Sequence, residues 1–364
     1  MSNLEALSLY GNQLKDIPTS LGKLSTLSSL NLNQNQITHI PLALTQLSQL
    51  ENLGLKQNHI SKIPSEISKL QNLKWLYLGG NQIKAIPPAI GALENLVHLY
   101  LGDNQITHIP TEISKLTELS YLYLYNNQIQ NIPIALGELI NLTTLYLHNN
   151  QIKFLPPALG NLSSLRTLYL NHNQIENFPP EIAKLKSLKR LHLEHNQITK
   201  IPMAMAELSS LRNFTIAQNR VEFASLEALQ GKLKFDYSPQ DTLGSRRNLS
   251  LAPEVKIGVR VAGSHNHYIW YRDHEMIAVG KQADSITVSH SGSYHVTITN
   301  EVIPNLILHH NPIIVETSQK HSSSTLASSS SAMQASSSSE AEPEDFIPLA
   351  SHHKPKLLSY APFQ

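Results

Sequence analysis

Cysteine is absent from the 364 residues of this chain. Its absence excludes disulfide bonds, thiolate catalysis and cysteine-ligated zinc or iron–sulfur sites, and it leaves the redox compartment open. Charged residues make up only 15% and the formal net charge is +1, so strong steering towards nucleic acid or a membrane surface is not indicated. No stretch reaches the ~20 consecutive apolar residues of a membrane-spanning helix. With 41% hydrophobic residues, the composition predicts a folded protein of more than one domain.

Asparagine recurs at a constant spacing, and each asparagine is as far from the next in the sequence as Asn12 is from Asn35. Leucine stands eight and three residues before each of these asparagines, except that Ile216 replaces the last one. Proline stands six residues after each of the first nine, from Pro18 to Pro202. A fixed period over two thirds of the chain predicts a stacked solenoid of ten units. The ladder consists of Asn12, Asn35, Asn58, Asn81, Asn104, Asn127, Asn150, Asn173, Asn196 and Asn219.

Each unit reads LxxLxLxxNxIxxIPxxIxxLxx, which combines two periodicities. Leucines that alternate with polar residues predict a short strand, and apolar residues three and four apart predict a helical turn. Stacked units would align their strands into a parallel sheet at about 4.8 Å per step and share one core. We expect the asparagine amide to satisfy backbone groups where the strand turns, and the proline to lead the chain into the outer turn. The repeated asparagines and the repeated prolines are both predicted to stabilise the fold rather than to bind a ligand.

This pattern resembles the leucine-rich repeat family over residues 1–237, and its NQIxxIP variant is similar to the repeats of Ras-associated and bacterial leucine-rich repeat proteins. The resemblance implies an α/β solenoid, a curved horseshoe of about ten repeats. It also implies that a protein or peptide ligand binds the concave face of the sheet. Specificity must then lie in the positions that vary between units.

The variable columns carry a band of aromatic and histidine residues. The column between the two strand leucines contains five successive tyrosines, from Tyr77 to Tyr169, and the columns two residues earlier and later add further rings. Aromatic side chains bury much area at low entropy cost, so they are typical anchors of interfaces. The predicted ligand-binding residues are Trp75, Tyr77, His98, Tyr100, Tyr121, Tyr123, Tyr125, Tyr146, His148, Tyr169 and His192.

A structural interpretation of the tyrosine column stands beside the functional one. Tyrosine could be the preferred residue of this repeat, stacking on itself to stiffen the sheet. Five residues of the band, however, break the repeat consensus, and stacking alone explains them less well. They are Trp75, His98, Tyr121, Tyr125 and His148.

Catalytic signatures such as a P-loop, GxSxG or HExxH are absent from the sequence. Asp103 and Glu194 stand four repeats apart, which makes them solvated surface carboxylates rather than an acid–base pair. His148, His172, His192 and His195 fall on the same or adjacent strands, but no carboxylate pattern fixes a coordination geometry around them. We therefore expect no enzyme, no catalytic residues, no cofactor and no metal site.

The two ends of the solenoid differ. After Asn219 the segment LEALQGKLKFDYSPQ replaces the helical turn, and we interpret it as a C-terminal cap that shields the last leucines. Leu4 already belongs to a repeat without an upstream neighbour, so we expect the natural chain to begin before Met1.

Residues 248–316 have another rhythm, with short β-branched runs separated by turn residues. The segments WYRD from Trp270 and SGSYHVTITN from Ser291 resemble the immunoglobulin motifs WYKDG and DSGxYxCxVxN. The resemblance implies an all-β sandwich in which Val259 and Val296 occupy the cysteine positions, Trp270 is the core tryptophan and Tyr294 is the corner tyrosine. Residues 238–247 are the expected linker.

Residues 317–364 begin with a serine-rich run that cannot bury enough apolar surface to fold, and an acidic patch follows. We predict a disordered tail. Repeats followed by an immunoglobulin-like region resemble bacterial surface or secreted proteins, which implies non-enzymatic recognition or adhesion. The alternative is an intracellular signalling scaffold like the Ras-associated repeat proteins. A cell-surface or secreted location is expected if the chain begins upstream, and a cytoplasmic one for the chain as given. The oligomeric state is left open.

Overall fold

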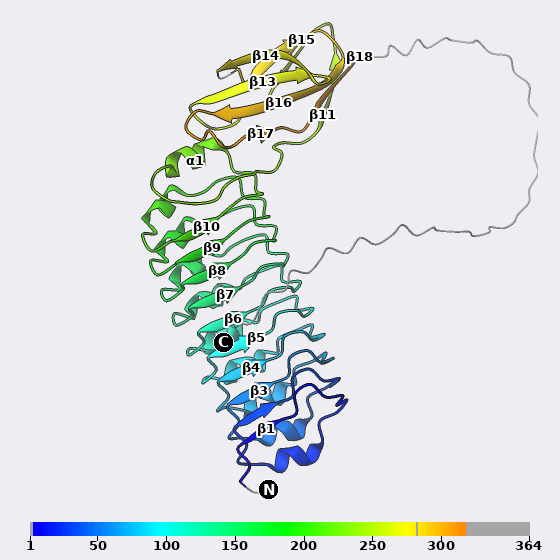
Figure 1. Cartoon of the computed structure of the whole chain (residues 1–364), viewed down its shortest axis with the longest axis vertical. Helices are drawn as coiled ribbons and strands as arrows, with labels where there is room; N and C mark the ends of the chain where they lie inside the picture. The colour runs from blue at the N-terminus through cyan, green and yellow to red at the C-terminus, as the bar shows by residue number, and fades with distance from the viewer. Residues whose placement is uncertain (1–2, 282, 318–364) are drawn as a thin grey trace, which may run out of the picture. The chain divides into compact units, whose positions relative to one another are not determined.

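The computed structural model describes residues 3–281 and 283–317. The predicted disordered tail lies outside the described residues, except for Thr317, the last residue of β18. The repeats form one parallel ten-stranded sheet whose strands follow one another in chain order (Figure 1). These strands are β1 Ala6–Ser8, β2 Ser29–Asn31, β3 Asn52–Gly54, β4 Trp75–Tyr77, β5 His98–Tyr100, β6 Tyr121–Tyr123, β7 Thr144–Tyr146, β8 Thr167–Tyr169, β9 Arg190–His192 and β10 Asn213–Thr215.

The strand register confirms the predicted columns. Each strand pairs with the strand of the next repeat at equivalent positions, so Leu76 lies between Leu53 and Leu99. The middle residue of nearly every strand is buried and its two neighbours face outward, as the alternation of the sequence predicts. Residues at the same place in successive repeats are therefore neighbours on one face of the sheet.

The helical segment of each of the first nine repeats is a 3₁₀ turn rather than an α-helical one. A proline precedes each turn with φ between −58° and −71°, and its carbonyl accepts the first hydrogen bond of the turn, as in Leu21 N–H to Pro18 O at 3.0 Å. The expectation that the proline leads the chain into the outer turn is confirmed. The turns are η1 Thr19–Lys23, η2 Leu42–Gln46, η3 Ser65–Lys69, η4 Pro88–Ala92, η5 Thr111–Lys115, η6 Ile134–Glu138, η7 Pro157–Asn161, η8 Pro180–Lys184 and η9 Met203–Glu207.

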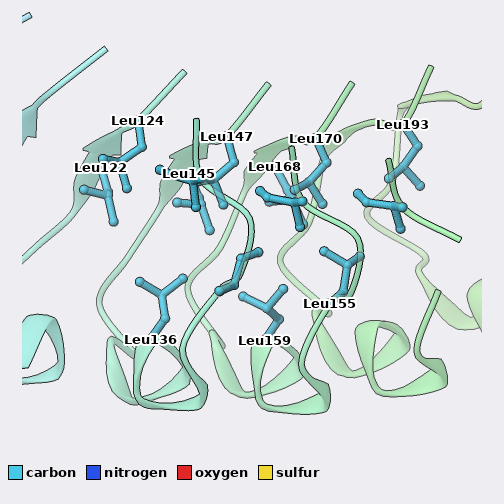
Figure 2. Packing of buried hydrophobic residues seen from close by; sticks show 14 of the residues in the cluster. Leu122, Leu124, Leu136, Leu145, Leu147, Leu155, Leu159, Leu168, Leu170 and Leu193 are labelled. Carbon is cyan, nitrogen blue, oxygen red and sulfur yellow. The ribbon is translucent and has the colours of Figure 1, made fainter. Parts of the chain in front are cut away.

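The core of the solenoid lies between the sheet and the 3₁₀ turns. Figure 2 shows strand leucines such as Leu145 and Leu168 pointing towards Leu136 and Leu159 of the turns. All four side chains are fully buried. Because each repeat contributes the same apolar set, one continuous cluster runs through the stack.

The asparagine ladder joins each repeat to the one before it. Asn58 donates from Nδ2 to the carbonyl oxygens of Leu55 at 3.1 Å in its own repeat and of Leu32 at 3.0 Å in the preceding one. Its Oδ1 accepts from the N–H of Ile37 at 3.0 Å. Asn58 is buried, and it pairs the Ile37 N–H, which would otherwise be buried without a partner. Leu32 O and Leu55 O each accept a second bond from the asparagine of a neighbouring repeat. The predicted structural role of the asparagines is confirmed.

The C-terminal cap closes the solenoid with helix α1, Phe223–Leu229, and with a segment that adds one more rung. Phe223, Leu226 and Leu229 are buried against the last repeat. Gln240 then takes the place of the next asparagine, since its Oε1 accepts from Val221 N–H at 2.9 Å and its Nε2 donates to Ile216 O at 3.0 Å and to Tyr237 O. The segment interpreted as a cap therefore continues the hydrogen-bond ladder.

The following residues form a small β region. Its larger sheet has the order β11-β18-β16-β13-β14 with β17 paired to β16, and β12 pairs with β15 in a second sheet. β11 runs parallel to β18, and the other pairs are antiparallel. The strands are β11 Arg247–Leu251, β12 Val255–Gly258, β13 Asn266–Arg272, β14 Glu275–Lys281, β15 Ser285–Val288, β16 Gly292–Asn300, β17 Leu308–His309 and β18 Ile313–Thr317.

Several details of the β region are consistent with the immunoglobulin-like resemblance. Trp270 is fully buried and donates from Nε1 to Ala283 O at 2.9 Å. The hydroxyl of Tyr294 donates to His290 O at 2.6 Å, four residues upstream, as a corner tyrosine does. Val259 and Val296 are both buried. β11 begins at Arg247, one residue inside the predicted linker, and the domain boundaries themselves stay predictions.

Hydrogen bonds join the cap to the β region. Glu227 of α1 accepts from the N–H of Ser264 at 3.0 Å and from Nδ2 of Asn300 at 2.6 Å. The N–H of Ala224 donates to Ala262 O at 2.9 Å.

Over the described part of the chain, no helix is long and apolar enough to cross a bilayer.

Candidate ligand-binding face

The exposed side of the ten-stranded sheet, here called the sheet face, carries the predicted aromatic band. Its central column runs Tyr77, Tyr100, Tyr123, Tyr146, Tyr169 and His192, with neighbours opposite one another in the strand register. The ring centroids of neighbouring tyrosines lie between 4.1 and 4.9 Å apart. The contacts are stacked except between Tyr123 and Tyr146, whose rings meet edge to face at 86°. The column therefore consists of two stacked blocks.

The two flanking columns widen this band. On one side Trp75, His98 and Tyr121 follow one another, with 4.3 Å between the centroids of the last two rings. On the other side Tyr125 stacks on His148 at 4.9 Å. The structure thus brings all eleven predicted residues onto one face, as the spacing indicated. Whether they bind a ligand stays a prediction.

Four tyrosine hydroxyls of the band have a raised pKa. Burial raises the pKa of Tyr77 and Tyr146, and it raises that of Tyr123 further still because a hydrogen bond with Tyr100 adds to it. Burial together with the nearby Asp103 carboxylate raises the pKa of Tyr125 to about 12. These four hydroxyls therefore stay protonated at neutral pH and can donate hydrogen bonds to a ligand.

Two half-buried side chains beside the central column, His148 and Glu194, have lowered pKa values. Burial lowers the pKa of His148 to about 4, and His172 contributes to the same shift. Burial opposes ionisation of Glu194, but hydrogen bonds from His192 and Thr215 outweigh it and hold the carboxyl pKa at about 2. His148 is therefore neutral and Glu194 charged near pH 7.

Some polar atoms of the band are buried without a hydrogen-bond partner among the described residues. They are Nδ1 of His98, Nδ1 of His148, Nε2 of His192 and Oε2 of Glu194. Buried polar groups are normally paired, so unsatisfied ones mark places where a ligand or water completes the bonding.

A row of polar side chains borders the sheet face where the strands end. Asn149 donates to Asn126 Oδ1, and Asn126 donates to Asp103 Oδ1, both at 2.6 Å. His172 and His195 continue the row with rings stacked at 4.0 Å. Each of these residues has a φ between 51° and 57°, a left-handed conformation that asparagine and aspartate tolerate better than most residues. The described residues include no group of three or more His, Asp or Glu side chains that could hold a metal ion.

One set of surface residues escaped the sequence reasoning. Seven residues before the repeated asparagine, repeats eight to ten place Arg166, Lys189 and Arg212 in one column, next to Arg190. The aromatic columns occupy the positions two, four and six residues before the asparagine, so this neighbouring column fell outside them. The same repeat spacing would have shown it.

Family models match most of the solenoid. The model described as "Leucine-rich repeat region" matches residues 43–145 and 134–235, and the model described as "Leucine rich repeat" matches residues 2–60. A search of curated proteins gave no match.

Solved structures of repeat proteins are similar to this chain. A leucine-rich repeat protein of Leptospira interrogans is 34% identical, with 65% of this chain and 67% of that chain covered and a TM-score of 0.55. The ectodomain of the plant receptor kinase GASSHO1/SCHENGEN3 from Arabidopsis thaliana, in complex with CASPARIAN STRIP INTEGRITY FACTOR 2, is 30% identical over 69% of this chain and 30% of that one, with a TM-score of 0.60. The plant peptide hormone receptor RGFR1, in complex with RGF2, is 29% identical, with 67% of this chain and 40% of that chain covered and a TM-score of 0.57. This chain therefore spans less than half of either plant receptor structure.

Proposed function

Because this chain belongs to the leucine-rich repeat family, we propose that it is a non-enzymatic recognition module whose sheet face binds a protein or peptide. The observation that carries the proposal is the aromatic band, eleven ring-bearing residues gathered on one face by the repeat register. Aromatic residues are enriched among the few side chains that supply most binding energy in interfaces. Two similar receptors were solved with bound partners, which supports a binding role.

The chemistry of the band suits a peptide backbone. Protonated tyrosine hydroxyls donate hydrogen bonds. The unpaired Nδ1 atoms of His98 and His148 are buried in the free protein, so they can pair with a ligand only after their rings rotate. The ring faces supply apolar area between these polar points. A ligand that lies along the column could therefore bury apolar surface and pair its polar groups together.

The competing interpretation is that the tyrosines only stack to stiffen the sheet. Closely stacked centroids, as in Tyr100 and Tyr123 at 4.1 Å, fit that interpretation as well. It does not explain the unpaired polar atoms, nor Trp75 and Tyr125 in columns where other repeats have unrelated residues. The two interpretations predict different results when the rings are removed. A binding role predicts weaker ligand binding, and a stiffening role predicts a lower melting temperature with unchanged binding.

The test uses a phage-displayed library of random 16-residue peptides, selected on the whole chain. Selected peptides are then measured against a variant with Trp75, Tyr100, Tyr123 and Tyr146 replaced by alanine. We expect their dissociation constants to rise at least about a hundredfold, because single aromatic anchors commonly contribute more than about 1 kcal/mol. Peptides that bind this variant equally well, together with a lowered melting temperature, would support the stiffening interpretation instead.

The matched control removes four large apolar side chains from other exposed positions of the solenoid. Leu42, Ile134, Phe154 and Met203 have exposed fractions of 58%, 73%, 57% and 59%. Their replacement by alanine should leave the dissociation constants within about twofold of the natural chain, since exposed side chains outside an interface contribute little to binding.

The finer assignment, recognition or adhesion at a cell surface, is also a proposal. It is supported by the β region, whose strand order and buried Trp270 are consistent with an immunoglobulin-like module. The alternative is an intracellular signalling scaffold. The genomic sequence upstream of Met1 separates them, because an export signal there would support the first and its absence the second.

A further inference from the structure

Charge is unevenly distributed over the sheet face. In the columns seven, six, four, two and one residues before the repeated asparagine, repeats eight to ten contain four cations and one carboxylate, Glu194. The same columns in repeats one to seven contain two cations and three carboxylates. The capping segment adds Lys234 and Asp236, which cancel one another. Taken as groups, only repeats eight to ten therefore carry a net positive charge on this face, although Lys56 and Lys74 lie in the same columns of earlier repeats.

The four cations form a compact group, here called the cationic strip: Arg166, Lys189, Arg190 and Arg212. Backbone hydrogen bonds link them in sequence, with Lys189 N–H to Arg166 O at 2.8 Å and Arg212 N–H to Lys189 O at 2.9 Å. Neighbouring strands of a parallel sheet are about 4.8 Å apart, so the charged side chains start close together. All four are exposed.

The cationic strip lacks carboxylate partners inside the described residues. The ion pairs found there involve other side chains, and Glu194 is paired with His192 at 3.2 Å. By contrast, Lys74 in the same column of repeat four is paired with Glu51 at 3.0 Å. Like charges on neighbouring strands destabilise a sheet, so an unneutralised group of four is unfavourable for the free protein. An anionic partner would relieve that repulsion.

The strip is continuous with the aromatic band. Arg190 pairs with Thr167, two residues before Tyr169 of the second tyrosine block, on the neighbouring strand. The positive charge of Arg190 also opposes the rise that burial causes in the pKa of Tyr146. Arg166 also lines a hollow of 420 Å³ together with Ser120, Thr143, Ser164 and Ser187, whose hydroxyls can donate to carboxylates. Glu118 lines the same hollow and would repel an acidic side chain there, so the acidic residues of a ligand are expected at the Arg166 side of it.

We propose that the ligand of the sheet face is a peptide segment with acidic residues at one end, which bind the cationic strip while its apolar residues lie on the aromatic band. The acidic end is thereby directed to repeats eight to ten, because Asp103 and the carboxylates of the first repeats disfavour it elsewhere. A nucleic acid fits less well, since a uniform polyanion long enough to cover the tyrosines would meet those carboxylates. This inference rests on the proposed function.

The experiment sequences the same random peptide library after selection on the whole chain. We expect enriched peptides to carry an excess of aspartate and glutamate towards one end, together with apolar residues. Arg166, Lys189 and Arg190 are then replaced by threonine, which repeats seven and eight have in these columns at Thr143, Thr144 and Thr167. Acidic peptides should bind this variant about tenfold more weakly in 0.05 M salt, the loss expected for three exposed charge pairs, and the difference should shrink in 0.5 M salt.

The matched control replaces Lys15, Lys84 and Lys153 by threonine. These lysines share one column, three residues after the repeated asparagine, where Thr38, Thr107 and Thr199 occur naturally. The control has the same change in net charge, so peptide binding within about twofold of the natural chain would show that position, not total charge, matters. An equal loss in both variants would overturn the inference.

The outcomes separate this inference from the proposed function. Peptides that need the aromatic residues but show no acidic excess, or that bind the threonine variant of the strip unchanged, would overturn this inference alone. Acidic peptides that ignore the loss of the aromatic residues would overturn the proposed function. Displacement of the peptides by single-stranded dT20 at equal concentration would also overturn the inference, because the strip would then be a surface for polyanions.

Discussion

In the solenoid every strand pairs with the strand of the neighbouring repeat, whereas in the β region Arg247 of the first strand, β11, pairs with Ile313 of the last strand, β18. Solenoid layers two to ten repeat nearly the same leucines and the same asparagine bonds. The β region instead has a core of single, unrepeated residues such as Trp270 and Tyr294. Damage should therefore remain local in the solenoid and spread through the whole β region.

The difference also concerns where binding residues can accumulate. In the solenoid a change at one surface column leaves the core of its repeat intact, so columns can diverge towards a ligand without a cost to folding. In the β region, Tyr268 and Val296 alternate with outward-facing neighbours on strands that also close the core. In the solenoid, therefore, the residues that stabilise the fold and the residues that can determine specificity are more fully distinct than in the β region.

The largest expected effect is that of Trp270→Ala. Loss of a fully buried tryptophan should cost about 3–5 kcal/mol and unfold the β region while the solenoid stays folded. The chain has two tryptophans, one in each region, so the emission of Trp75 reports the solenoid in this variant. Trp75→Ala is the matched control and should leave the Trp270 transition unchanged. Simultaneous unfolding of both regions in Trp270→Ala would contradict their independence.

The next effect is that of Asn127→Ala in the middle of the ladder. It leaves the buried Ile106 N–H without a partner, while Leu101 O and Leu124 O each keep one asparagine donor, Asn104 and Asn150 respectively. The free energy of unfolding of the solenoid should therefore fall by roughly 1–3 kcal/mol. Asn12→Ala is the control, since Asn12 is exposed and donates only to Leu9 O and Tyr10 O. Urea titration of each variant in the Trp270→Ala background, where Trp75 is the remaining tryptophan, measures both. Equal losses at the two positions would rule out the role of burial.

A smaller effect is expected for Tyr294→Phe. It removes the hydroxyl that donates to His290 O and should destabilise the β region by about 1 kcal/mol, with no change in the solenoid transition. Tyr10→Phe is the control, because Tyr10 is 53% exposed and lies in the first repeat. Urea titration of each variant in the Trp75→Ala background, where Trp270 is the remaining tryptophan, is the measurement. A midpoint of Tyr294→Phe equal to that of the natural chain would argue against the corner bond as a stabilising contact.

The smallest effect concerns acid. The pKa of His148 is lowered to about 4 by burial, so between pH 6.5 and 4 the unfolded chain takes up a proton that the folded chain does not. The stability contributed by neutral His148 is therefore fully present above pH 6.5 and is lost as the pH falls towards 4. Glu194, with a pKa of about 2, keeps its contribution over this window.

The melting temperature of the natural solenoid should fall by roughly a few degrees between pH 7.5 and pH 5. In the His148→Asn variant the fall over the same pH range should be smaller. Burial also lowers the pKa of His98 and His172, so part of the fall should remain in that variant. His108→Asn, at an exposed position, is the control and should follow the natural chain. A fall that is identical in all three proteins would exclude His148 as a source of it.

The sequence predicted the solenoid well because its information is repeated. The period sets the register, and the register alone places Trp75 beside His98 and Tyr125 beside His148. Repetition could not predict the ring geometry, such as the edge-to-face contact between Tyr123 and Tyr146, because that depends on side-chain torsions rather than on spacing.

The β region was less predictable because its strands carry weaker signals. β11 has a polar, asparagine- and serine-containing sequence, and β14 has exposed apolar residues such as Met276 and Val279, so neither fits the pattern of a half-buried strand. Their pairing partners are set by tertiary contacts that local sequence does not contain. The cationic strip was missed for a different reason, since its signal was periodic but lay in a column next to those of the aromatic band.

The eleventh rung made by Gln240 has a consequence for how such a chain can change length. Each rung requires only carbonyl and N–H groups from the rung before it, and the cap meets this requirement with a glutamine. Any whole repeat could therefore be duplicated or deleted inside the array without a new joint to the cap. Each duplication would lengthen the ligand track by about 4.8 Å, so gene rearrangement alone could match this protein to a longer or shorter partner.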